Sequence, residues 1–100
     1  MKKQISISKT GKYSQIGKCS KKINNVWIVL HGYGMLSEYF VKKFECIINE
    51  TTLVIAPEAT NRFYLANNYT RVGASWMTKL DKEQEISDNI LFLDKLFSII

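Results

Sequence analysis

Apolar residues form two short uninterrupted runs in this chain. The first run, Val26-Trp27-Ile28-Val29-Leu30, contains no polar residue and three β-branched side chains. The second run, Leu53-Val54-Ile55-Ala56, stops at Pro57. Continuous apolar runs of this length are typical of strands that are buried on both faces of a parallel sheet. We therefore predict two core strands, at residues 26–30 and 53–56.

Helical spacing appears in two other segments. After the first strand we expect Ser37 to cap a helix, whose apolar positions are Phe40, Phe44, Ile47 and Ile48. Near the end of the sequence we expect Asp81 to cap a second helix, whose apolar positions are Ile86, Ile90, Leu93, Phe97 and Ile100. A strand, a helix and a strand in this order predict a crossover that places two parallel strands side by side.

The amino-terminal residues alternate between apolar and polar on either side of Thr10-Gly11-Lys12. This period of two around a glycine predicts an antiparallel hairpin over residues 5–16. In contrast, residues 58–80 show neither period, and they are too apolar for disorder. We expect this aromatic loop to pack near the strand ends, where it either lines a pocket or covers the sheet.

The first apolar run ends abruptly at His31-Gly32-Tyr33-Gly34. Two glycines in four residues permit a sharp turn and leave room for a ligand to approach backbone N–H groups. This segment resembles the His-Gly-x-Gly segment of the serine α/β-hydrolases, particularly the small carboxylesterase, lysophospholipase and acyl-thioesterase branch. The Ala56-Pro57 pair that ends the second strand is similar to the same family.

The resemblance implies a single partial α/β-hydrolase domain over residues 1–100. Its fold would be an amino-terminal β-hairpin followed by parallel strands with flanking helices, without the half that carries the nucleophile. The backbone N–H of Tyr33 would stabilise the oxyanion of a tetrahedral intermediate, and Gly34 would shape the loop. His31 would support the loop rather than serve as the triad base, because the family places that histidine after the nucleophile. Substrate contacts would come from Met35, Tyr64 and Trp76.

One segment partly matches the G-x-S-x-G nucleophile motif of that family. Gly73-Ala74-Ser75-Trp76-Met77 has Met where G-x-S-x-G requires the last glycine. The motif also needs a strand before the serine and a helix directly after it. Residues 68–72 are a poor buried strand, so we do not expect Ser75 to be a nucleophile. The triad residues would then lie outside this sequence.

Charge, hydropathy and cysteine spacing restrict the classes of partner that we expect this protein to bind. The net charge of +5 arises from seven lysines in residues 1–22, a segment that holds no acidic residue and no arginine. We interpret these lysines as a solvated sheet edge and expect no nucleic-acid partner. No apolar run approaches ~18 residues, so no membrane insertion is expected. The two cysteines lack metal-site spacing, and Cys46 is expected to be a packed thiol. The sequence thus predicts a cytoplasmic protein without metal or cofactor.

Two classes of function follow. The first is a carboxylic ester or thioester hydrolase that acts on a small acyl substrate, with this chain supplying the oxyanion-hole loop and part of the acyl pocket. The alternative is a non-catalytic fragment, or a small binding module that uses the aromatic loop 58–80. If the chain is a fragment of a hydrolase, the unpaired edge of its core strands should cause self-association or partial folding. A well-folded monomer would instead favour the binding module.

Overall fold

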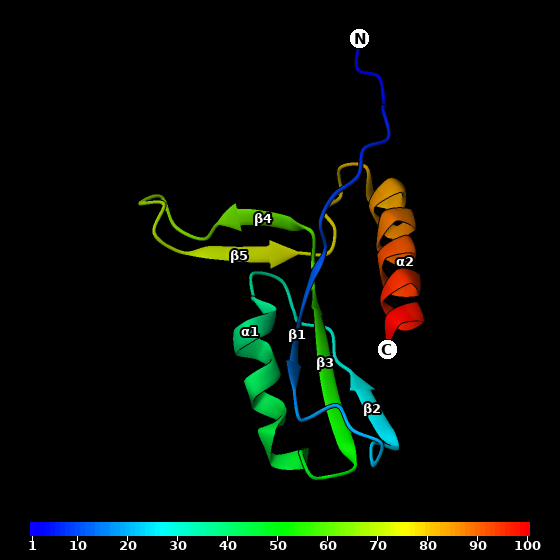
Figure 1. The fold of residues 1–100 in the computed structure, drawn as a ribbon. Coiled ribbons are helices and arrows are strands. Elements are labelled where there is room, and N and C mark those ends of the chain that lie inside the picture. Colours follow the sequence, from blue (N-terminus) through cyan, green and yellow to red (C-terminus); the bar gives the residue numbers. More distant parts are fainter.

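The computed structural model describes all residues from Met1 to Ile100 and contains two small sheets (Figure 1). The first sheet has the spatial order β1-β3-β2, and its strands are β1 (Lys12–Ile16), β2 (Asn25–Ile28) and β3 (Thr52–Glu58). The second is a hairpin of β4 (Asn61–Tyr64) and β5 (Val72–Ser75). Helix α1 (Ser37–Phe40) continues as a 3₁₀ segment, η1 (Val41–Ile47), and the last element is helix α2 (Lys82–Ile99).

Strand β3 is the centre of the core, because it is paired on both edges and covered on both faces. All seven of its residues are buried. Its side chains alternate between two clusters, as a strand requires. Val54 and Ala56 pack with Val29 and with Val41 of η1, whereas Leu53 and Ile55 pack with Leu96 of α2. The helical elements therefore lie on opposite faces of the first sheet (Figure 1).

The prediction of a partial α/β-hydrolase fold is wrong. Strand β1 pairs with β3 antiparallel, and β4 pairs with β5 antiparallel. The parallel pairing of residues 26–28 with 53–55 is present, but it is the only parallel pair. The apolar run at residues 26–30 misled the prediction, since β2 lies at the edge of its sheet and Trp27 is 52% exposed.

The predicted hairpin over residues 5–16 is also absent. Residues 1–11 form no strand and are exposed along their whole length. Only Lys12–Ile16 is a strand, and its partner is β3 rather than an adjacent segment. Ile5 and Ile7 have the two-residue period that predicted a strand. Their side chains nevertheless remain exposed and do not pack in the core.

Both helices form at the predicted places, but their caps differ. Helix α1 begins at Ser37 with Leu36 in the N-cap position. Asp81 precedes α2 in a left-handed conformation (φ 55°) and makes no side-chain capping hydrogen bond. Only Leu96 of α2 is buried, so most of its predicted apolar stripe faces outward. Neither helix is both long enough and apolar enough to cross a membrane.

The outer edge of β2 presents unpaired backbone donors. Asn25 and Val29 donate their N–H groups toward the β3 side, to Thr51 and Ile55. Because donors alternate between the two edges of a strand, the N–H groups of Val26 and Ile28 point away from β3. No lysine or proline protects this edge, whereas β1 carries Lys12.

The chain also exposes more surface than a compact protein of its size. Its accessible area is 7826 Å², against about 5,800 Å² for a folded monomer of the same mass. Its radius of gyration is 15.6 Å, against about 13 Å for a compact chain of this length. The difference of roughly 2,000 Å² exceeds the ~800 Å² that one partner buries in an interface of standard size.

We predict that the chain associates with itself through the β2 edge. A lysine at an exposed edge position discourages strand pairing, so Val26→Lys should shift the protein toward monomer in light scattering. Gln15→Lys, which places the same charge on the β1 edge, is the matched control and should leave the association unchanged. A monodisperse wild-type monomer with strongly protected amides in residues 26–30 and 53–56 would contradict this prediction.

Candidate functional site

The segment from His31 to Leu36 connects β2 to α1, and we call it the glycine loop. It turns sharply because the Met35 N–H donates to the Gly32 carbonyl at 3.2 Å. Gly34 has φ 79°, close to the value that the second central residue of a type II turn requires. The Gly32–Met35 turn therefore depends on glycine at position 34, where any other residue would be strained.

His31 anchors the start of the glycine loop. Its side chain is buried, and its Nε2 accepts the Ala59 N–H at 3.0 Å. An N–H can only donate, so the ring is the neutral tautomer whose Nδ1–H donates to the Gly32 carbonyl at 2.8 Å. The ring stacks on Trp76 with centroids 5.2 Å apart, and the Trp76 Nε1–H donates to the His31 carbonyl at 3.0 Å. Both ring nitrogens are therefore engaged in holding the loop.

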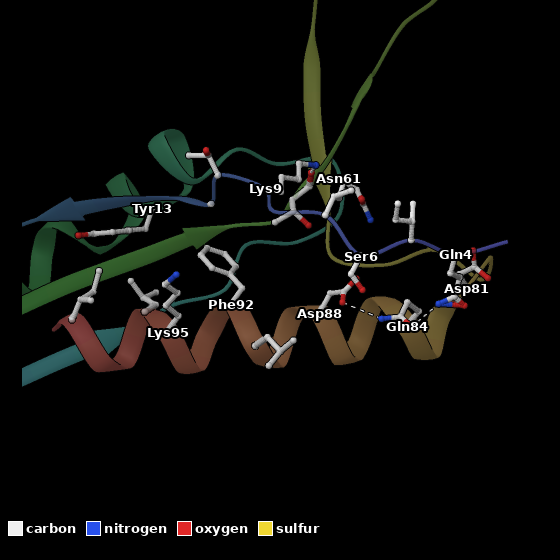
Figure 2. Close-up of a pocket in the computed structure, with 18 of the residues that line it drawn as sticks. Gln4, Ser6, Lys9, Tyr13, Asn61, Asp81, Gln84, Asp88, Phe92 and Lys95 are labelled. Carbon is white, nitrogen blue, oxygen red and sulfur yellow. Dashed lines mark hydrogen bonds between the residues drawn. The ribbon is translucent and has the colours of Figure 1, made fainter.

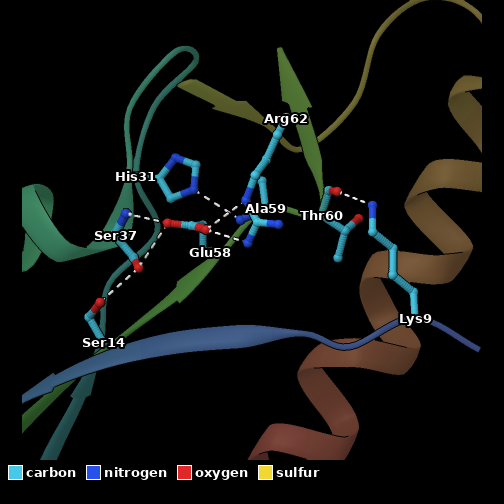
Figure 3. A network of polar contacts seen from close by, with 8 residues as sticks. All are labelled: Lys9, Ser14, His31, Ser37, Glu58, Ala59, Thr60 and Arg62. Carbon is cyan, nitrogen blue, oxygen red and sulfur yellow. Dashed lines mark hydrogen bonds and ion pairs between the residues drawn. The ribbon is translucent and has the colours of Figure 1, made fainter. Parts of the chain in front are cut away.

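Glu58 anchors the other end of the loop (Figure 3). Its Oε1 accepts hydrogen bonds from the Ser37 N–H at 3.1 Å and from the Ser37 hydroxyl at 3.3 Å. Its Oε2 accepts from Arg62 Nε at 3.1 Å and Nη2 at 2.7 Å. The carboxylate is buried at the first residue of α1, where a negative charge is favourable. It thereby joins α1, β3 and β4 through a single side chain.

The pKa of Glu58 follows from these contacts. Burial raises the pKa, but the hydrogen bonds and charge of Arg62 and the hydrogen bonds of Ser37 lower it more. The net result is a pKa below the ordinary value of 4.5. Glu58 is therefore ionised at neutral pH and holds Arg62 and Ser37 through charge-assisted hydrogen bonds.

The hairpin of β4 and β5 packs its backbone directly against the glycine loop. The Gly34 N–H donates to the Ala74 carbonyl at 2.9 Å, and the Ala74 N–H donates to the Met35 carbonyl at 3.0 Å. A Cβ atom at Gly73 would lie 2.5 Å from the Gly34 carbonyl oxygen. Position 73 must therefore be glycine for the two segments to approach this closely.

Three backbone donors of the loop, at His31, Tyr33 and Leu36, have no acceptor in the chain. Among the residues of the turn itself, the N–H of Tyr33 makes no hydrogen bond within the protein, whereas the amides of Gly32, Gly34 and Met35 all do. The Tyr33 side chain is 73% exposed and packs on Phe63 with ring centroids 5.0 Å apart. The Tyr33 N–H is thus an open donor on a loop that is fixed at both ends.

The structure brings most of the predicted site residues together. His31, Tyr33 and Gly34 form the glycine loop, Trp76 contacts His31, and Met35 bridges to Ala74. Tyr64 does not join them, because its ring packs on Tyr69 with centroids 5.0 Å apart. The aromatic loop 58–80, predicted without regular structure, contains β4 and β5.

Ser75 and the cysteines occupy less reactive positions. Ser75 is buried at the end of β5, and its hydroxyl donates to the Met77 carbonyl at 2.9 Å. Cys46, predicted to be packed, is exposed like Cys19, since it lies on the outer side of η1. No group of three or more His, Cys, Asp or Glu side chains is placed to hold a metal ion.

The sequence analysis did not identify the residues that hold the glycine loop in place. These are Glu58, Ser37 as a hydrogen-bond donor to Glu58, the Ala59 amide, Arg62 and Gly73. A signal was present in the sequence. Glu58 directly follows a buried apolar strand, and Arg62 lies four residues later. A charge in that position requires a partner, and the nearest cation in sequence is the observed one.

Two cavities flank this arrangement. The larger, about 1000 Å³, lies between residues 3–11 and α2, away from the glycine loop (Figure 2). The smaller, about 660 Å³, begins at Gly34 and runs between α1 and the hairpin. Of these two cavities, only the smaller is lined by residues of the glycine loop, namely Gly34, Met35 and Leu36.

Comparison with known proteins identified no relative, since no family model, no curated protein and no solved structure matches this chain.

We predict that Gly73→Ala destabilises the protein by about 1–3 kcal/mol, because the new methyl group collides with the Gly34 backbone. Gly32→Ala is the matched control, since a Cβ there lies 3.6 Å from the Met35 sulfur, an ordinary contact. The control should stay within about 0.5 kcal/mol of wild type in urea unfolding followed by tryptophan fluorescence. Equal effects of the two substitutions would show that the hairpin does not pack on the loop as described.

We also predict a specific loss of stability in acid. The folded-state pKa of Glu58 lies below the unfolded value, so its contribution is complete above pH 4.5 and disappears as the pH falls through the folded pKa. Glu58→Gln should remove this part of the pH dependence in unfolding experiments between about pH 7 and about pH 3. Glu50→Gln is the control, because Glu50 pairs with Lys22 in a fully solvated position and should matter little.

Proposed function

We propose that this chain takes part in the hydrolysis of carboxylic esters or thioesters and supplies the oxyanion-binding loop. The observation that carries the proposal is the free Tyr33 N–H, which lies between the engaged amides of Gly32 and Gly34 in the turn. A donor that is fixed before the reaction stabilises a developing negative charge without reorganisation. The proposal depends on this loop and not on the strand arrangement, since the same chemistry recurs on unrelated folds.

The roles of the surrounding residues follow from their contacts. His31 positions the loop, because both of its ring nitrogens are already used and neither can accept a proton from a nucleophile. Gly34 keeps the turn in which Tyr33 is the first central residue. Trp76 lies beside the loop and Met35 within it, and both would contact the acyl group. The serine and the base of the reaction would come from residues outside this sequence.

A second candidate is a binding module that uses the hairpin. Tyr64 and Tyr69 pack edge to face at the far end of β4 and β5 and are both largely exposed. Exposed aromatic side chains of this kind are common in binding surfaces. This function needs no oxyanion site, so the two candidates differ in what they expect at Tyr33.

Titration of the ¹⁵N-labelled chain with butyrate tests the proposal. The carboxylate should shift the amide proton of Tyr33 downfield more than any other amide of the glycine loop, because it accepts that hydrogen bond. Butyramide, which is uncharged, should cause a smaller shift. Gly34→Val should abolish the response by distorting the turn, and Gly32→Ala should preserve it.

Two outcomes would contradict the proposal. One is a folded wild-type chain whose Tyr33 amide does not respond to butyrate while Tyr64 and Tyr69 respond to other ligands, which favours the binding module. The other is turnover of p-nitrophenyl butyrate by the chain that disappears in Ser75→Ala. That result would make Ser75 the nucleophile and require another source for the base.

A further inference from the structure

The smaller cavity forms a groove with a mainly apolar lining. It has a volume of about 660 Å³ and runs from Gly34 between α1 and the hairpin. Sites for small molecules commonly have volumes of ~300–1,000 Å³. Its apolar residues are Met35, Leu36, Tyr39, Phe40, Leu65 and Val72. The groove therefore offers an apolar wall that begins at Gly34, the residue that follows Tyr33.

Several of these apolar side chains are exposed although they are neighbours. Met35, Tyr39, Leu65 and Val72 each leave more than a third of their surface in contact with solvent. Single exposed apolar residues are ordinary, but a contiguous group marks a surface that binds something. An occupant with an apolar portion would remove this surface from water.

The charges around the groove have one sign. Lys43 and Arg71 are lining residues, and no aspartate or glutamate lines the groove with them. Neither cation forms an ion pair, because the ion pairs of the chain are Lys22–Glu50 and Arg62–Glu58. The Lys43 ammonium lies 5.7 Å from the Phe40 ring centroid, over the wall of the groove.

The larger cavity lacks this combination. Asp81 and Asp88 line it together with Lys9 and Lys95, so its charges are mixed (Figure 2). One of its walls is the extended segment 3–11, whose residues are all exposed. It therefore selects neither an anionic nor a cationic ligand.

We propose that the groove binds a single acyl chain that carries an anionic group. The chain would lie along the apolar wall, and the anionic group would pair with Lys43 and Arg71. This inference rests on the proposed function in one respect, since it names the class of acyl substrate or product for the same loop. The charge complementarity of the groove selects this ligand over neutral or cationic chains of equal length.

Binding of three ten-carbon probes to the ¹⁵N-labelled chain tests the proposal: decanoate, decanol and decyltrimethylammonium, each below its micelle concentration. Decanoate should perturb the amides of Met35, Leu65 and Val72 and bind at least about fivefold more tightly than decanol. Decyltrimethylammonium should bind most weakly, because both cations of the groove repel it.

Substitutions identify the source of the preference. Lys43→Gln with Arg71→Gln should reduce the decanoate-to-decanol affinity ratio toward one while the amide spectrum stays folded. Lys18→Gln with Lys21→Gln, an equal loss of charge at two exposed positions outside the groove, should leave the ratio unchanged. Equal affinity for the three probes, or perturbation confined to residues 3–11 and α2, would overturn the proposal.

The result is separable from the test of the oxyanion loop. If decanoate binding depends on Lys43 and Arg71 but butyrate does not shift the Tyr33 amide proton, the anionic acyl site is supported and the hydrolase function is contradicted. If butyrate shifts the Tyr33 amide proton but the double substitution leaves the affinity ratio unchanged, the oxyanion-binding role of the loop is supported and the anionic ligand class is wrong.

Discussion

Two consecutive residues at the end of β3 determine the geometry of the whole glycine loop. The buried carboxylate of Glu58 holds the first residue of α1, and the amide of Ala59 holds the ring of His31. The two ends of the loop are therefore attached to adjacent points on the most buried strand of the protein. Because β3 is paired on both edges, neither attachment moves independently of the core.

Backbone contact between two glycines extends this control to the hairpin. Gly34 and Gly73 approach so closely that no side chain fits between their backbones, and the hydrogen bonds of Ala74 on either side fix their register. Tyr33 lies within this turn, so the packing also holds its unpaired N–H in place. A solvated loop with the same sequence would sample many conformations and offer no fixed donor.

Local pattern predicted local structure well in this chain but did not predict strand position. Residues 53–56 and the first three residues of the run 26–30 lie in strands, and these strands pair in parallel as expected. The pattern did not reveal that β2 lies at an edge, because an apolar run describes composition and not the number of neighbours. It also predicted a strand at the amino terminus that does not form. Ile5 and Ile7 have the period of a strand, but they remain exposed and have no partner strand.

The sequence places some of the candidate site residues near one another, but it does not reveal the residues that hold them. His31, Gly34 and Trp76 lie together, since the short motif and the following strand place them near one strand end. Glu58, Arg62 and Gly73 were missed because their roles arise only from contacts between segments that are distant in sequence. Gly73 belongs to a near-copy of a nucleophile motif, but its observed role is to make space for Gly34.

The shared Glu58 carboxylate has a consequence for the dynamics of the molecule. Arg62 belongs to β4 and Ser37 to α1. The single Glu58 side chain therefore links the hairpin to the helix. The hairpin cannot detach without also releasing Trp76 from His31 and Ala74 from the loop. Loop and hairpin should therefore open as one cooperative unit in hydrogen exchange. A ligand that binds either segment would slow amide exchange in both by mass action.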